Sequence, residues 1–64
     1  MAAVDLFEAF NASLSHNEQT TVQALLREKR EALFAARSEE ARLRSVNDYI
    51  ASAHEMLKKA GSRS

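Results

Sequence analysis

The side chains that could carry chemistry are few and do not converge. The sequence has two histidines, His16 and His54, and the second is followed by Glu55. A general base needs a partner and a dry pocket, and a zinc site needs three or four ligands at a suitable spacing. With a single glycine and no cysteine, a glycine-rich phosphate loop and a thiolate metal site are excluded as well. The sequence therefore predicts a protein that is not an enzyme and that has no cofactor and no metal.

A second candidate for chemistry is a set of arginines in the middle of the chain. Three of them lie at intervals of seven residues and would form a line along a continuous helix, where they could follow the phosphates of a nucleic acid. Glutamates at a spacing of four, such as Glu40 before Arg44, are instead typical of a solvated helix surface with internal ion pairs. A nucleic-acid-associated regulatory protein is therefore the alternative hypothesis. Its candidate contacts are Arg27, Arg30, Arg37, Arg42 and Arg44.

A stripe of apolar residues near the C-terminus is the clearest pattern in the chain. Its members, in steps of three and four, are Leu43, Val46, Ile50, Ala53 and Leu57. Such spacing places them on one side of a helix, and another helix must cover that side. Tyr49 and Met56 widen the stripe beyond the width that one neighbouring helix covers. We expect these seven residues to form a protein-interaction surface.

Two aromatic residues near the N-terminus extend this expectation. Phe7 and Phe10 either close the core of the chain as a lid or anchor it in a groove of another protein, since aromatic residues often dominate helix-in-groove binding. Asn11 falls on the same side of the helix as Val4 and Phe7. A polar group at this position indicates that the face is not uniformly buried.

The elements that position these residues are helices. Proline is absent and the only glycine is Gly61, so propensity favours helix almost throughout and predicts an all-α fold in a single domain, residues 1–64. Ser15 and Glu18 fit a capping box, Ser38 can cap a further helix, and Gly61 suits a helix C-terminus. The predicted helices cover about 3–13, 16–36 and 39–60, followed by a frayed tail at 61–64.

The connection near residues 36–38 leaves two arrangements open. The favoured one is an antiparallel helical hairpin with the short N-terminal helix packed across it. The alternative is the N-terminal helix plus one long coiled-coil helix, about 16–60, zipped against a second copy. The coiled-coil seam would contain Lys29 and Glu39, which weakens it, whereas the hairpin lacks the glycine or asparagine that a helix end normally takes.

Size and composition point towards association. A chain of 64 residues buries only about 60% of the surface that its unfolded form exposes, and without cysteine it has no disulfide to compensate. The N-terminus has neither a basic segment nor a long apolar run, so we expect a cytoplasmic protein without a membrane span. The sequence predicts a small non-enzymatic protein–protein interaction module, such as an adaptor, co-chaperone, assembly factor or inhibitor. Its partner would be another protein, itself as a homo-oligomer, or both.

Overall fold

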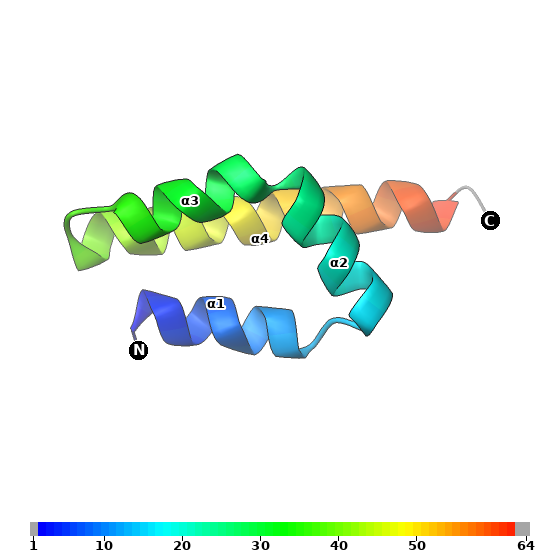
Figure 1. The fold of residues 1–64 in the computed structure, drawn as a ribbon, viewed down its shortest axis with the longest axis horizontal. Coiled ribbons are helices and arrows are strands. Elements are labelled where there is room, and N and C mark those ends of the chain that lie inside the picture. Colours follow the sequence, from blue (N-terminus) through cyan, green and yellow to red (C-terminus); the bar gives the residue numbers. More distant parts are fainter. Residues whose placement is uncertain (1, 63–64) are drawn as a thin grey trace.

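The computed structural model describes residues 2–62, and these form four helices and no strand (Figure 1). The helices are α1 (Ala3–Ala12), α2 (His16–Leu25), α3 (Arg27–Ala35) and α4 (Glu39–Ser62). The all-α class expected from the sequence is confirmed. Helix α4 continues past Gly61 to Ser62, so the expected end at Gly61 is wrong, and the last two residues of the predicted frayed tail lie outside the described part of the chain.

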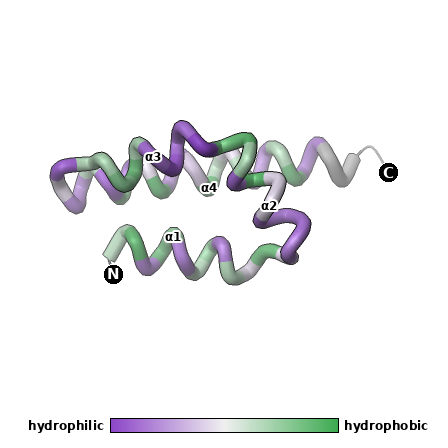
Figure 2. The backbone as a smooth tube through the Cα atoms, viewed as in Figure 1, coloured by the Kyte–Doolittle hydropathy of each residue, from purple (hydrophilic) through white to green (hydrophobic). Residues whose placement is uncertain are grey.

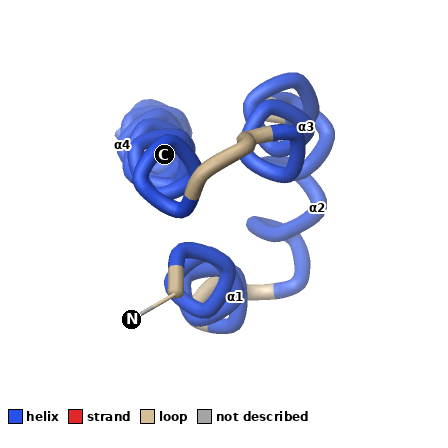
Figure 3. Tube along the Cα trace, turned by 90° about the vertical axis from the view of Figure 1, so that its left-hand side faces the viewer, coloured by secondary structure: helices blue, strands red, loops and turns tan. Residues whose placement is uncertain are grey.

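Helices α1, α3 and α4 lie along the length of a molecule of 40 × 19 × 15 Å (Figure 1). Helix α3 runs antiparallel to α4, and α1 packs along another side of α4 (Figures 1 and 3). Helix α2 is the bridge that carries the chain from the end of α1 up to α3. Figure 2 shows that apolar residues recur along each helix between polar ones, as expected for helices that bury one side.

The chain reverses direction between α3 and α4, so the predicted alternative of one continuous helix over about 16–60 is wrong. Ala36 leaves the helix in an extended conformation, with φ −61° and ψ 137°. Arg42 Nη2 donates a hydrogen bond of 2.8 Å to the Ala36 carbonyl, and Ser38 Oγ accepts one of 3.1 Å from the Ala41 N–H. These two side chains satisfy backbone groups at the turn, which explains how it forms without a glycine or asparagine.

The second predicted helix, about 16–36, is also divided. Leu26 has φ −106° and ψ 26°, which ends α2 and starts α3 in a new direction (Figure 1). The hydrogen bonds from Leu26 N–H to the Val22 carbonyl (2.8 Å) and from Arg30 N–H to the Leu26 carbonyl (2.9 Å) are kept, so the break is a kink. Val22, Leu26 and Leu33 are all buried on its inner side. At spacings of four and seven these three residues lie on one side of a helix, and the kink keeps that side buried while it turns α2 towards α1 (Figure 1).

The corner between α1 and α2 is held by the capping box that the sequence predicts. Ser15 Oγ accepts from the Glu18 N–H at 3.3 Å, and Glu18 Oε1 accepts from the Ser15 N–H at 2.9 Å. Gln19 Nε2 also donates to the Asn11 and Leu14 carbonyls, at 2.7 and 3.2 Å. The end of α1 is therefore tied to the start of α2.

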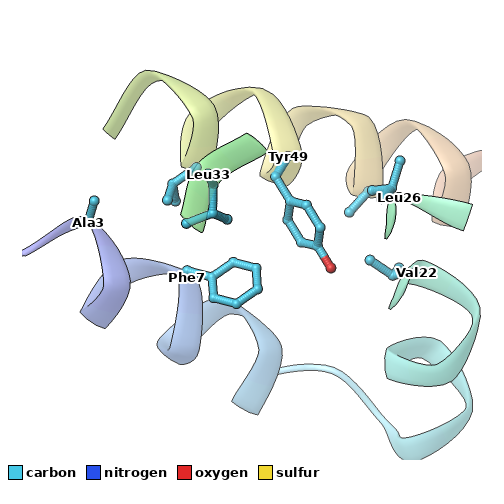
Figure 4. Close-up of a cluster of buried hydrophobic side chains, with 8 residues drawn as sticks. Ala3, Phe7, Val22, Leu26, Leu33 and Tyr49 are labelled. Carbon is cyan, nitrogen blue, oxygen red and sulfur yellow. The ribbon is translucent and has the colours of Figure 1, made fainter. Parts of the chain in front are cut away.

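A single cluster of buried side chains joins all four helices (Figure 4). Tyr49 of α4 lies at its centre with no exposed surface. Its ring meets those of Phe7 and Phe10 edge to face, with centroid distances of 5.0 and 6.2 Å. The buried members are Ala3, Phe7, Val22, Leu26, Leu33, Val46, Tyr49 and Ala53.

Candidate interaction surface

A groove runs between α1 and α3, and we call it the α1–α3 groove. Both helices pack against α4 (Figure 3). Helix α2 contributes Gln23 to the lining of the groove. The groove has a volume of about 480 Å³ and is lined by Phe7, Asn11, Gln23, Arg30, Glu31 and Phe34.

The apolar part of the groove is an aromatic pair. Phe34 packs edge to face on the buried ring of Phe7, with a centroid distance of 5.6 Å and an interplanar angle of 88°. Phe34 nevertheless keeps 56% of its surface exposed. A large aromatic side chain that is fixed on the core and half open to solvent is the type of residue that dominates many protein interfaces.

The charged part of the groove is a half-buried arginine without a counter-ion. Arg30 forms no ion pair with any residue in the described part of the chain. The neighbouring carboxylate of Glu31 is bound instead by Arg27, at 3.3 Å. The wall of the groove therefore carries a positive charge that pairs with no carboxylate of the described residues, beside an exposed aromatic ring and the carboxylate of Glu31.

Two buried polar atoms have no hydrogen-bond partner among the described residues, and one of them belongs to a residue that lines the groove. Asn11 donates from Nδ2 to the Phe7 carbonyl at 3.2 Å, but its Oδ1 is buried and accepts no hydrogen bond from the described residues. The Tyr49 hydroxyl is likewise buried and unpaired within residues 2–62. Burial raises the pKa of Tyr49, and the positive charge of Arg30 acts in the opposite direction. Arg30 thus links the groove electrostatically to the core.

The C-terminal stripe is mostly buried within the chain itself, whereas a surface that binds another protein has to be exposed. Val46, Tyr49 and Ala53 are fully buried in the core of the chain itself. Ile50, Met56 and Leu57 are half-buried against that core, and Leu43 keeps 38% of its surface exposed. The stripe is therefore covered by helices of the same chain, chiefly α1 and α3.

The two aromatic residues near the N-terminus are also packed against other parts of the same chain. Phe7 is only 6% exposed, so of its two predicted roles the structure gives it that of a core lid. Phe10 is half-buried and stacks on His54, with a centroid distance of 5.5 Å. The polar face indicated by Asn11 does exist, because Asn11 lines the groove beside Phe7.

The arginines do not form the line expected on a continuous helix. Arg37 lies in the turn at residues 36–38, and this turn separates the arginines of α3 from those of α4. Arg42 and Arg44 pair with Glu39 and Glu40, at 3.4 and 3.5 Å. The five candidates are therefore spread over two antiparallel helices and a turn, and three of them, Arg27, Arg42 and Arg44, are in ion pairs.

Residues 2–62 contain no group of three or more histidine, cysteine or acidic side chains that could hold a metal ion. No helix in the same range is long and apolar enough to span a membrane.

Sequence reasoning missed Phe34 and Gln23 as groove residues, and it assigned Arg30 to nucleic-acid binding. Phe34 follows the buried Leu33 directly, so it lies at the edge of the apolar side of α3, where periodicity does not separate a core position from a surface one. The only available signal was Asn11. Its polarity indicates an open face on α1, but not which helix lies opposite.

Comparisons with known proteins add no relatives: no family model, curated protein or solved structure matches the chain.

Proposed function

We propose that this chain is a non-enzymatic protein–protein interaction module that binds a partner protein in the α1–α3 groove. One observation carries the proposal: Phe34 is 56% exposed although its ring is held by Phe7 at the mouth of the groove. A partner that covers this ring removes apolar surface from water, and this favours binding. The groove supplies the concave surface that such a partner needs.

The proposal moves the interaction surface from the C-terminal stripe to the groove. The centre of the stripe belongs to the hydrophobic core, since Val46, Tyr49 and Ala53 have no exposed surface. Adaptor, co-chaperone, assembly-factor and inhibitor roles all use a surface of this kind, by bringing proteins together or by occluding one of them. A cytoplasmic location belongs to the same proposal, because a chain without cysteine has no structural need of an oxidising compartment.

Site-specific photo-crosslinking in the native host tests this function. A photoreactive phenylalanine analogue replaces Phe34 in one variant and Leu25 in the other. Leu25 is the matched control, since it is 67% exposed but does not line the groove. We expect a discrete crosslinked protein from position 34 that is absent from position 25, and its loss in competition with the unmodified chain.

The stability of Phe34→Ala and the solution mass complete the test. Because Phe34 is largely exposed, Phe34→Ala should keep the helical signal while it loses the crosslinked partner. Light scattering measures whether the chain is a monomer or an oligomer. Equal crosslinking from positions 25 and 34, or none from either, contradicts the proposed function.

A further inference from the structure

We propose that the occupant of the α1–α3 groove is an amphipathic helix of another protein that presents a carboxylate to Arg30. The inference rests on the proposed function and names the chemistry of the partner. Three observations carry it: the arrangement of the helices around the groove, the uncompensated charge of Arg30, and the exposed ring of Phe34.

The arrangement of the helices favours a helix as the occupant. Seen end-on, α4, α3 and α1 lie at three corners of a four-cornered bundle, and α2 runs into the space at the fourth (Figure 3). Helix α2 turns away to join α1, and the groove lies on this side of the molecule, lined by residues of α1, α2 and α3. A short helix placed there would contact α1 and α3 and complete a four-helix packing. The 10 residues of α1 limit its contact length to about 15 Å, or some three turns.

The charge of Arg30 determines what that helix carries. Covering a half-buried guanidinium with apolar groups would remove water from a charge that has no ion pair within the described residues, and this is costly. A carboxylate removes the cost, because it accepts two parallel hydrogen bonds from the planar guanidinium. Glu31 also lines the groove, but its carboxylate lies against Arg27, at 3.3 Å, and forms no ion pair with Arg30. The partner therefore has to supply the Asp or Glu.

The aromatic pair determines the position of an apolar anchor. Phe34 follows Arg30 by four residues and lies one turn further along α3. A partner helix that covers both therefore needs a large apolar residue three or four positions from its acidic residue. Leu, Phe or Met at that spacing would lie against Phe34 and Phe7.

A second copy of this chain fits the groove less well. The exposed Leu43 has carboxylates three and four residues before it, but Glu39 and Glu40 are already bound by Arg42 and Arg44. A helix of one copy seated in the groove of the next closes into a dimer only if the two copies exchange helices reciprocally, and otherwise gives a head-to-tail chain. The mass measured by light scattering decides this point.

Selection from a displayed library of helical 12-residue peptides, with the folded chain as bait, tests the inference. The library varies all surface positions of the helix. We expect enriched peptides to carry Asp or Glu three or four residues from a large apolar residue. Arg30→Glu should weaken their binding on the order of 10- to 100-fold, the value of a charge-assisted hydrogen bond. The matched control Arg44→Glu makes the same charge change at a side chain 81% exposed and outside the groove, and should leave binding within about twofold.

A second selection uses Arg30→Glu as the bait and should enrich Lys or Arg at the position that was acidic. Arg30→Gln removes the charge and keeps a polar, shorter side chain, and circular dichroism verifies that each bait is folded. Enriched peptides without an acidic preference, or peptides that bind Arg30→Gln as well as the wild type, overturn the inference while the function proposed from Phe34 crosslinking stands. Failure to enrich any peptide, or a dimer that buries Phe34, overturns it too, and absence of crosslinks from position 34 removes the function itself.

Discussion

Replacement of Tyr49 by Phe should stabilise the protein. Tyr49 has no exposed surface, and its hydroxyl has no hydrogen-bond partner among residues 2–62. The ring itself is well placed, with edge-to-face contacts to Phe7 at 5.0 Å and to Phe10 at 6.2 Å. Phe keeps both ring contacts and removes only the unpaired oxygen.

The expected gain follows from the cost of burying that oxygen. A buried polar group without a partner costs about 1–3 kcal/mol, and part of this is returned by the packing that the oxygen provides. We therefore expect Tyr49→Phe to raise the free energy of unfolding by about 1 kcal/mol. In a domain of this size that corresponds to a rise in Tm of about 4–8 °C. The whole stability of such a chain is about 3–10 kcal/mol, so the change is easily measured.

The same substitution should change the pH dependence of stability. Burial raises the pKa of Tyr49 above its ordinary value of about 10, although the charge of Arg30 lowers it in part. The folded state therefore holds the phenolic proton more tightly than the unfolded state does. As the pH rises past about 10, the unfolded state loses its proton first, and the wild type loses stability that Tyr49→Phe keeps. The difference in stability between the two proteins should widen above that pH.

Urea denaturation followed by circular dichroism, at neutral pH and above pH 10, measures both effects. Tyr49 is the only tyrosine and tryptophan is absent, so the ultraviolet absorbance of the wild type reports phenol ionisation in the core alone. Tyr49→Ala serves as the contrasting variant and should lose about 3–5 kcal/mol, because it also removes the ring. A Phe variant less stable than the wild type, or a phenol that ionises below pH 10, would show that the hydroxyl is paired and refute the reasoning.

Three further predictions concern the lid, the caps and the ion pair between Lys29 of α3 and Asp48 of α4. Phe7→Ala should destabilise the protein by about 3–5 kcal/mol in a thermal melt, since Phe7 is 6% exposed, and an unchanged melt would contradict its role as a lid. Ser15→Ala and Ser38→Ala should each cost about 1 kcal/mol by urea denaturation, because each removes an oxygen that caps a helix, and Thr at either position should restore most of it. A double-mutant cycle on Lys29 and Asp48 should give a coupling below about 1 kcal/mol despite the short 2.6 Å contact, because both side chains are largely exposed; a larger coupling would mean that the pair is desolvated.

The parts of the fold that depend on neighbouring residues could be predicted from the sequence. The capping box joins Ser15 to Glu18, and the cap of α4 joins Ser38 to Ala41, three residues in each case. Both interactions are local and need no knowledge of the rest of the molecule. The all-α class is equally local, since it follows from the absence of proline and the near absence of glycine.

The kink at Leu26 could not be predicted in this way. No proline or glycine stands there, and the hydrogen bonds to and from Leu26 are those of a helix. The bend turns α2 from the direction of α3 towards α1 (Figure 1), and Val22, Leu26 and Leu33 stay buried across it. Propensity and periodicity do not contain this information, because it depends on where the other helices lie.

The groove escaped prediction for a related reason. The stripe on α4 indicated correctly that a helix must cover it, but periodicity does not say whether that helix belongs to the same chain. Phe34 and Arg30 lie at the edge of the buried side of α3, and a small rotation of α3 would bury or expose them. Asn11 was a valid sign of an open face because a polar side chain is seldom placed on a fully buried one.

Binding of a partner at Arg30 in the groove should change the pKa of Tyr49 in the core. Its charge lowers the pKa of Tyr49 against the larger effect of burial. A carboxylate bound to Arg30 would cancel much of that charge, so the pKa of Tyr49 should rise further when an acidic helix binds. By linkage, ionisation of Tyr49 at high pH should then weaken the binding of that helix by the same factor. A peptide selected as above should therefore shift the absorbance titration of this single tyrosine to higher pH, and one bound elsewhere on the surface should leave it unchanged.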